Sequence, residues 1–410
     1  MITVKKPRIT QENGISTVTT EVWFDQEKKE LAFWFDSTYE PYLTVDRGDG
    51  FLVELFYFAM RYHHDMTFEC PISERLLFQI ETCIFDANHE ADADFYVPKI
   101  ICQTVDEPYT PQGGAVATGC SCGVDALSSL YSMNEKNDLA GHKVNLLTYF
   151  HVGDAMYDNG KEVMDASDRP VNLVQYDNAK RFAQAAELPL LFVDTNFAYE
   201  IVMPQGKVHT YRHCGIVLFF QKLFRTYYYA SSFNLDGFKV VPSVDCSFAD
   251  LFTVPNFSTD NVTFYSSDAT YSRVRKTQQI ADYPLAQQFL NVCWTSGKNC
   301  GVCPKCARTQ MTLDAFGKLE QFGAVFDLEQ HRKKKAMQVG YAVYAHKKDY
   351  YYKEIYPLLK KAHKISMASR LWAVCFWLAG PVERWMRKQP PEKRKKFVDF
   401  AKKVNLRVPY

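Results

Sequence analysis

The most informative segment of the chain reads Ala115-Val-Ala-Thr-Gly-Cys-Ser-Cys-Gly-Val-Asp-Ala126. The small apolar residues at 115–118 predict a buried strand, the glycines that follow predict a tight turn, and a helix is expected from there to about Leu139. Where a strand turns into a helix, unpaired backbone N–H groups and the positive end of the helix dipole can hold a phosphate group. The turn at 119–125 is therefore the first candidate binding site.

The side chains of this turn suit that use. Gly123 allows a ligand close to the backbone, Ser121 can donate a hydroxyl hydrogen bond, and Asp125 can orient a bound metal ion or the turn itself. An ordinary strand-to-helix turn without a ligand explains the same residues, and the sequence leaves both interpretations open.

The order of strand, turn and helix recurs between residues 109 and 322. Apolar strands are expected at 144–151, 190–194 and 226–231, with helices at 178–187 and 212–225. Such alternation predicts an α/β fold whose parallel sheet is covered by helices on both faces. Ligands bind at the carboxyl ends of the strands in sheets of this kind.

Four cysteines lie close together near residue 300, in the order Cys293, Cys300, Cys303 and Cys306. The last three form two overlapping C-x-x-C knuckles, and Cys293 can return over the intervening residues to complete a tetrahedral site. Four thiolates at about 2.3 Å are the usual ligand set of structural zinc. Because no coordination position is left for water, the predicted Zn²⁺ is structural and not catalytic. A chance cluster of reduced thiols is the competing explanation.

These features, in this order, resemble a known family. The loop Ser121–Ala126 is similar to the S-G-G-x-D-S motif (the PP-loop) of N-type ATP pyrophosphatases, with Cys122 at the first glycine and Ala126 at the final serine. More specifically, 109–322 resembles the 7-cyano-7-deazaguanine synthase (QueC-like) family. The matching features are the loop, a strand at 146–153, a helix at 176–187, the segment Lys276-Thr-Gln-Gln-Ile280, and the cysteine pattern up to Arg308.

The resemblance implies a parallel-sheet, adenine-nucleotide alpha-hydrolase-like (PP-loop) domain and an ATP-dependent ligase. ATP and Mg²⁺ would bind at the loop residues Ser121, Cys122, Gly123, Val124, Asp125 and Ala126. A substrate carboxylate, such as a deazaguanine acid, would attack the α-phosphorus and release pyrophosphate. An amine or ammonia would then displace AMP from the acyl-adenylate. Positioning and charge stabilisation supply most of the catalysis in such transfers.

The resemblance also suggests roles for individual residues. Ser121, Asp125 and Lys276 are the expected catalytic residues, with Lys276 as the cation near the phosphates. Arg273 or Arg275 could serve in its place, and a solvated basic helix start is the competing explanation.

Further candidates follow the predicted strands. His151 and Gly153 are expected to line the adenine side of the crevice, although a buried structural histidine is an equal alternative. Asp194, Asn196 and Arg212 are expected, with Arg273, to bind the substrate. An Asx turn explains Asp194 and Asn196 nearly as well. Arg212 and its neighbour His213 are expected at a helix start.

The regions on either side of 109–322 lie outside the resemblance. Residues 1–108 are expected to form an α+β unit, with strands at 17–24 and 31–35, a charged turn at 25–30, and helices at 51–62 and 73–85 that Ser73 would cap. The segment 46–50 is either a binding loop or the lead-in to a helix. Residues 323–410 are expected to be helical, with breaks at 380–381 and 390–391.

Charge is distributed unevenly. Residues 331–410 contain 21 Lys and Arg against 5 Asp and Glu, which leaves 27 basic and 42 acidic residues in the first 330. A basic tail indicates a polyanionic partner, a membrane surface, or contact with the acidic body. The apolar stretch 371–380, flanked by basic residues, is either an interfacial helix or a helix docked on the body.

Composition excludes several classes of protein. The chain has 410 residues, of which 47% are hydrophobic, and it contains 12 cysteines. Because no leader and no membrane span are visible, a reducing, cytoplasmic location is expected. Three functions remain open: a ligase that joins a small carboxylate to ammonia or to a protein acceptor, as in antiviral defence; a tRNA-modifying enzyme that uses Cys120, Cys122 or Cys214; and a non-catalytic nucleotide-binding protein.

Overall fold

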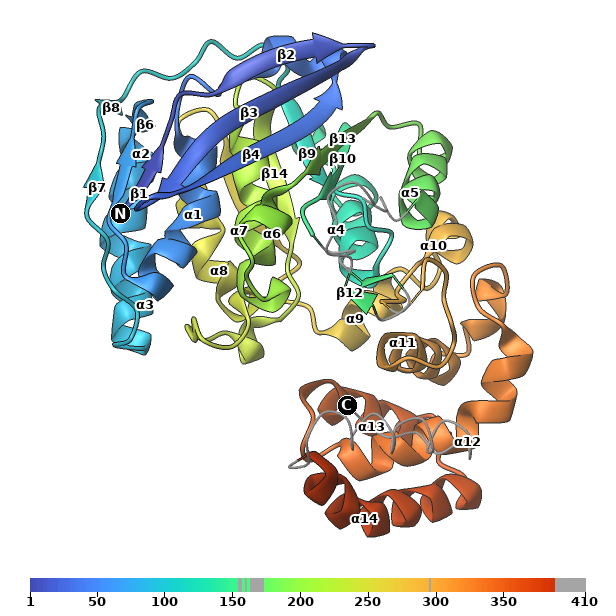
Figure 1. Cartoon of the computed structure of the whole chain (residues 1–410). Coiled ribbons are helices and arrows are strands. Elements are labelled where there is room, and N and C mark those ends of the chain that lie inside the picture. Colours follow the sequence, from blue (N-terminus) through green and yellow to red (C-terminus); the bar gives the residue numbers. More distant parts are fainter. Residues whose placement is uncertain (154–156, 159–160, 163–172, 295, 388–410) are drawn as a thin grey trace. The chain divides into compact units, whose positions relative to one another are not determined.

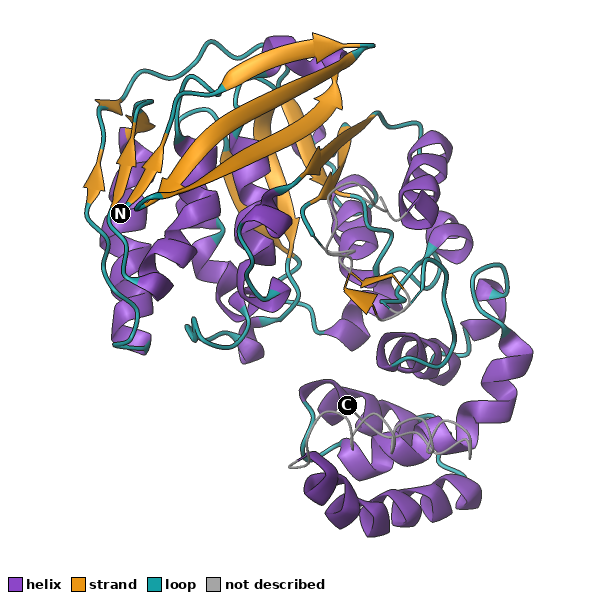
Figure 2. Cartoon of the chain, in the orientation of Figure 1, coloured by secondary structure: helices purple, strands orange, loops and turns teal. Residues whose placement is uncertain are grey.

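The computed structural model describes residues 1–153, 157–158, 161–162, 173–294 and 296–387. The chain divides into two compact units, Met1–Cys300 and Gly301–Tyr410. In the first unit helices accompany a large sheet, as the prediction of an α/β fold requires (Figures 1 and 2). The described part of the second unit is helical.

The main sheet has 11 strands in the described residues, in the order β15-β14-β9-β10-β13-β4-β3-β1-β5-β7, with β2 paired to β3. The first five strands are parallel to one another. β4 then joins β13 in an antiparallel pair, so strands from 1–108 and from the following segment share one sheet. The bounds of the five parallel strands are β9 Ala115–Gly119, β10 Leu146–His151, β13 Leu190–Thr195, β14 Phe224–Ala230 and β15 Thr263–Ser267.

The parallel strands confirm the four strands predicted after residue 109, and each is apolar and buried along most of its length. Their order has a functional consequence. From β9 the chain proceeds to β10 and β13 on one side, and then crosses to β14 and β15 on the other. Connections that leave neighbouring strands in opposite directions open a crevice at the carboxyl ends of those strands. The crevice is therefore expected beside β9 and β14.

The N-terminal strands form a long hairpin. β3 and β4 pair over their full length and are joined by a turn at Asp25, whose backbone φ is 53°. The prediction of a charged turn over 25–30 is therefore wrong at its end, because residues 27–30 belong to β4. Their charges remain in solvent, where Lys28 pairs with Glu21 across the hairpin. The other strands are β1 Ile2–Val4, β2 Arg8–Glu12, β3 Ile15–Phe24, β4 Glu27–Asp36, β5 Met66–Phe68, β6 Ile72–Ser73, β7 Ile100–Ile101, β8 Thr104–Val105, β11 Tyr157–Asp158 and β12 Lys161–Glu162.

Helix α1 (Asp49–Tyr62) confirms the helix predicted at 51–62, and it packs along α7 (Figure 1). The segment 46–50 leads into this helix. Asp49 is buried and accepts hydrogen bonds from the Ser73 backbone N–H and from Gln221. Ser73 precedes the next helix but makes no capping bond, because its hydroxyl donates to Asp49 instead. That helical stretch comprises α2 Glu74–Gln79, the π-helix η2 Ile80–Phe85 and α3 Asp86–Ala91.

Helix α7 (Gln205–Leu218) corrects the helix predicted at 212–225 by about two turns. Pro204 precedes its first residue, and proline is favoured at helix starts because it lacks an N–H group. Arg212 and His213 therefore lie within the helix and not at its start. The remaining helices of this unit are α4 Val124–Asn134, α5 Leu173–Ala185, α6 Phe197–Glu200, α8 Asp250–Thr253, α9 Arg273–Gln279 and α10 Pro284–Phe289, with the short 3-10 helices η1 Ser37–Tyr42, η3 Ala140–His142, η5 Leu235–Gly237, η6 Cys246–Ala249 and η7 Pro255–Phe257.

The second unit contains α11 Pro304–Ala315, η8 Leu319–Phe322, α12 Leu328–Ala345, α13 Tyr350–Lys361 and α14 Met367–Arg387. α12 and α14 pack closely at Gly340, where a Cβ atom would lie 2.7 Å from the Ser369 carbonyl oxygen. The predicted helix break at 380–381 is wrong, because α14 continues through both residues. The break predicted at 390–391 lies outside the described residues. No helix in the described ranges is long and apolar enough to cross a bilayer.

Candidate functional site

The turn after β9 forms at the predicted place and has an unusual backbone. Cys122 adopts a left-handed conformation with φ of 55°, which most side chains avoid. Its carbonyl accepts a hydrogen bond of 2.8 Å from the Asn291 N–H. Its side chain is buried, whereas Ser121 is exposed and its hydroxyl oxygen lies 3.3 Å from the Gly123 N–H that donates to it. Helix α4 begins at Val124, so the turn presents the start of an 11-residue helix.

Two cations converge on the first turn of that helix. Arg273 Nη2 lies 2.6 Å from Asp125 Oδ2, and Lys276 Nζ lies 3.3 Å from Asp125 Oδ1. Lys276 also donates to the Ser231 carbonyl, directly after β14. Its side chain is 1% exposed, whereas Arg273 is 25% exposed. The predicted residues Asp125, Arg273 and Lys276 are thus in contact, and they join the ends of β9 and β14.

This contact corrects one detail of the sequence interpretation. A solvated helix start was the competing explanation for the basic residues of α9, and Lys276 does not fit it because its ammonium group is buried. The ion pairs offset the cost of burying that charge. At this point two positive charges face one carboxylate, at a helix start whose dipole adds further positive potential. The local field therefore favours an anion.

His151 and Asp194, which the sequence predicts in different roles, lie in contact. They are the last paired residues of the neighbouring strands β10 and β13, and register places them side by side. His151 Nδ1 lies 2.7 Å from Asp194 Oδ1, and both side chains are buried. The other ring nitrogen, Nε2, is also buried and has no hydrogen-bond partner in the described structure. The carboxylate fixes the ring, and in the tautomer whose Nδ1–H donates to Asp194 the lone pair lies on Nε2.

The remaining candidates lie at the same ends of β10 and β13. Asn196 accepts a hydrogen bond from the Ala32 N–H at 2.7 Å and donates to the Glu30 carbonyl at 2.8 Å, so it links β13 to β4. Gly153 has φ of 102°, and a Cβ atom there would lie 2.4 Å from the Ala198 Cβ. The Arg212 guanidinium donates to the carbonyls of Val152 and Ile201. These contacts secure the segments that follow the strands.

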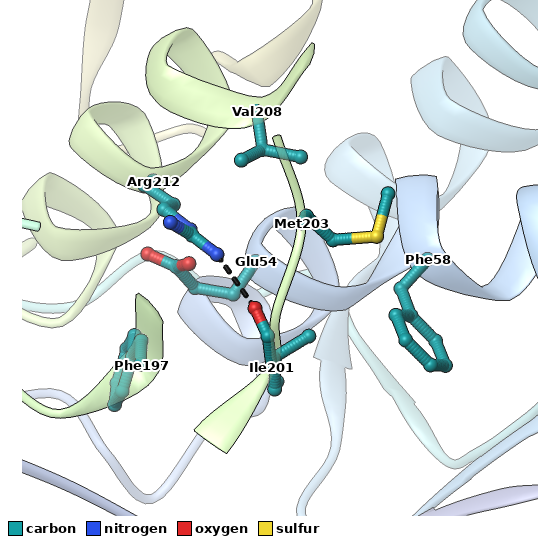
Figure 3. A pocket seen from close by; sticks show the side chains of 7 residues that line it. All are labelled: Glu54, Phe58, Phe197, Ile201, Met203, Val208 and Arg212. Atoms are coloured by element: carbon teal, nitrogen blue, oxygen red, sulfur yellow. Dashed lines mark hydrogen bonds between the residues drawn. The ribbon is translucent and has the colours of Figure 1, made fainter. Parts of the chain in front are cut away.

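Arg212 also lines a small pocket with Glu54, between α1 and α7 (Figure 3). Its volume is about 10 Å³, which is roughly the space of one water molecule. Burial holds the pKa of Glu54 well above its ordinary value, while the charge of Arg212 opposes that shift. The pocket is too small for a nucleotide or a bicyclic acid. Its other lining residues are Phe58, Phe197, Ile201, Met203 and Val208.

The four predicted cysteines converge. The sulfur atoms of Cys293, Cys300, Cys303 and Cys306 all lie within 4.8 Å of one another, and three of the four residues are buried. The Cys306 N–H donates to Cys303 Sγ at 3.4 Å, and Pro304 begins α11 directly after Cys303. Four convergent thiols with an N–H···S bond at a helix start are a donor set that fits a tetrahedral metal ion. The cluster can therefore hold a metal such as zinc.

Two backbone groups that make hydrogen bonds at this site could not be inferred from the sequence. The Ser231 carbonyl and the Asn291 N–H are backbone groups, and neither leaves a pattern of residue types. Only the expected position of Ser231, at the carboxyl end of a strand, pointed to that region.

Comparison with protein-family models, with curated proteins and with solved structures finds no match to this chain, so its family is not established by similarity.

Proposed function

We propose that this protein is an ATP-dependent ligase that adenylates a carboxylate and forms an amide, with release of pyrophosphate and AMP. One observation carries the proposal. The glycine turn after β9 lies where the strand connections diverge, and Lys276 and Arg273 converge on the first helical turn beside it. This is where α/β sheets bind ligands, and the local charge suits a triphosphate.

The loop supplies the phosphate contacts in this proposal. The first turn of α4 provides backbone N–H groups without intrahelical partners, and Ser121, which is exposed, adds a hydroxyl group. Arg273 and Lys276 strengthen the positive potential at this end of the helix. Mg²⁺, when bound with the nucleotide, would neutralise phosphate charge, and Asp125 is the carboxylate nearest to the turn.

The reaction balances in two steps. A substrate carboxylate oxygen attacks the α-phosphorus, the bond from that phosphorus to the bridging oxygen breaks, and pyrophosphate leaves. An amine then attacks the acyl carbon, loses a proton, and AMP leaves. We assign the proton acceptor to His151 Nε2, because Asp194 holds the ring and Nε2 has no partner in the described structure. The activated acid is proposed to be a deazaguanine-type acid, with ammonia or a protein amine as acceptor.

The cysteine cluster has a structural role in this scheme. Four thiolates leave no coordination site for a substrate, so a bound Zn²⁺ would brace the segment that follows Asn291. Asn291 in turn holds the Cys122 carbonyl of the loop.

A tRNA-thiolating enzyme is the less favoured alternative. Sulfur transfer needs an accessible thiolate. Cys120, Cys122 and Cys214 are all buried, and burial raises the pKa of the Cys214 thiol. A hydrogen bond that the Cys122 thiol donates to Cys120, together with burial, raises the pKa of Cys122. A non-catalytic nucleotide-binding protein is the third possibility, and it predicts ATP affinity without turnover.

The test is a turnover assay with the full chain, ATP, Mg²⁺ and a panel of carboxylic acids that includes 7-carboxy-7-deazaguanine. We expect AMP and pyrophosphate in equal amounts with one acid of the panel. Lys276→Gln and Arg273→Gln should each lower kcat/KM for ATP by about 100-fold or more, because each removes a cation that stabilises developing phosphate charge.

Lys222→Gln is the matched control, since Lys222 precedes β14 at the opposite end of the sheet. Arg273→Gln is easier to interpret than Lys276→Gln, because the Arg273 side chain is partly exposed and its replacement should disturb folding less. ATP binding with no AMP from any acid would favour the non-catalytic alternative. Absence of ATP binding in the folded protein would refute the proposal.

A further inference from the structure

Three metal-binding side chains meet in the first unit, away from the four-cysteine cluster. His209 lies on the second turn of α7, while Asp245 and Cys246 lie at the start of η6. Their donor atoms, one imidazole nitrogen, one carboxylate oxygen and one sulfur, all lie within 4.8 Å of one another. The proposed ligase chemistry uses none of these residues.

The hydrogen bonds around His209 fix its orientation. The Tyr229 hydroxyl donates to Thr210 Oγ1 at 3.2 Å, so it can accept a hydrogen bond from His209 Nδ1, which lies 3.1 Å away. That assignment puts the proton on Nδ1 and leaves the Nε2 lone pair directed toward Asp245. A metal-ligating histidine characteristically donates its other N–H to such a partner.

The separation between the donors suits a shared cation. His209 Nε2 lies 3.5 Å from Asp245 Oδ1, which is longer than an ordinary hydrogen bond. Two ligands at about 2.0–2.2 Å from one tetrahedral Zn²⁺ are roughly 3.3 Å apart. A nitrogen lone pair and a carboxylate oxygen repel each other unless a cation, either a metal ion or a proton on Nε2, lies between them.

The surroundings add a buried carboxyl group and a route from solvent. Asp250 is buried, accepts from Thr210 Oγ1 at 2.8 Å, and its other oxygen has no hydrogen-bond partner among the described residues. The same Thr210 hydroxyl accepts from Cys246 Sγ at 3.4 Å. His209 and Asp245 are 21% and 36% exposed, so a small ligand can reach the cluster. The Asp245 carboxylate and the Cys246 thiol beside one imidazole suit a dication.

We propose that His209, Asp245 and Cys246 form a second metal site, which binds Zn²⁺ through three protein ligands and leaves a fourth position open. An open position distinguishes this site from the closed four-cysteine cluster and is typical of zinc that binds water or substrate. Tyr229 lies near the carboxyl end of β14, so the site is at the same edge of the sheet as the turn after β9. The proposal stands independently of the ligase function.

Zinc stoichiometry tests the proposal directly. The full chain, saturated with Zn²⁺ and freed of excess metal, should contain two zinc ions per chain by mass spectrometry of the metal. His209→Gln and Cys246→Ser should each contain one, and so should Cys303→Ser, which removes a ligand of the other cluster. Cys214→Ser is the matched control, because this buried cysteine of α7 lies outside both clusters, and it should retain two.

Cobalt spectra of the folded protein separate the two sites, because the thiolate-to-Co²⁺ absorption reflects the number of sulfur ligands. In Cys303→Ser the remaining Co²⁺ should show absorption from a single thiolate, and Asp245→Asn should weaken that binding by about 10-fold or more. One zinc ion in the wild type together with none in Cys303→Ser would overturn the proposal. So would an equal rate of Cys246 alkylation with and without saturating Zn²⁺, since that result describes a free thiol.

Discussion

Glu54 places a carboxyl group in apolar packing between two helices. It is 7% exposed, and its Oε1 atom has no hydrogen-bond partner in the described part of the chain. Burial raises the pKa of this carboxyl well above the ordinary value of 4.5, and the nearby Arg212 charge opposes the shift (Figure 3). Ionisation of Glu54 therefore destabilises the folded state.

This shift predicts a pH dependence of stability. The folded protein holds the Glu54 proton more tightly than the unfolded chain, so the stabilising contribution is complete below pH 4.5 and is lost as pH rises through the raised pKa. Glu54→Gln cannot ionise. Between pH 4.5 and the raised pKa, the free energy of unfolding of the wild type should fall relative to this variant by up to about 1.4 kcal/mol per pH unit, and the difference should then level off. Melting temperatures measured across pH would show it.

The control for that measurement is Glu74→Gln, an exposed position at the start of α2. A plot of its melting temperature against pH should run parallel to that of the wild type. If the plot for Glu54→Gln also runs parallel to that of the wild type, the buried carboxyl keeps an ordinary pKa, and the expected pH dependence is wrong.

At the scale of elements, the turns at the carboxyl ends of strands are held by local geometry. Gly153 follows β10 in a conformation that other residues rarely adopt, and it faces α6 with no room for a methyl group. We expect Gly153→Ala to destabilise the fold by about 2–4 kcal/mol, from backbone strain plus displacement of Ala198. Thermal or denaturant unfolding measures this.

Gly14→Ala isolates the first of these two effects, the backbone strain. Gly14 also has a positive φ, 76°, but a Cβ atom there would meet nothing within 4 Å. It should therefore cost only the backbone term, about 1 kcal/mol. Equal losses for both variants would show that the contact with Ala198 adjusts without cost.

The strands β9, β10, β13 and β14 were predictable from the sequence because they are buried along most of their length, whereas β15, which mixes polar and apolar residues of differing exposure, was not. The start of α7 was not, since residues 205–211 mix polar and apolar side chains without a clear helical period. Charged residues at 25–30 favour a loop in a sequence-based prediction, but an exposed two-stranded ribbon accommodates them, so the true turn is shorter.

The candidate site was predictable only in part. Residues that follow strands or form a motif could be named, including Asp125, Lys276 and the four cysteines. The contacts between these residues could not be predicted, because Asp125 and Lys276 lie far apart in the chain and come together only through the order of the strands. The cluster of His209, Asp245 and Cys246 left no motif, since its ligands come from a helix and a distant irregular segment.

At the scale of the whole molecule, charge and exposed apolar surface coincide in the second unit. The basic excess lies in residues 331–410, and α14 within it exposes one row of large apolar side chains. The opposite side of α14 packs against α12. The exposed side chains are Met367, Leu371, Val374, Trp377 and Leu378, between 54% and 70% exposed. Packing against α12 therefore accounts for only one side of this helix.

An apolar row within a basic region predicts adsorption to anionic membranes. Each basic residue near such a surface contributes about 1 kcal/mol, and burying Leu371 and Trp377 adds about 2 kcal/mol each. The full chain should sediment with phosphatidylserine vesicles at low salt, and not with phosphatidylcholine vesicles or at high salt. Leu371→Ser combined with Trp377→Ser should weaken binding by about 100-fold or more. Leu139→Ser with Val202→Ser, equally exposed in the first unit, should not. If both double variants bind like the wild type, charge alone drives adsorption and the row on α14 has another use.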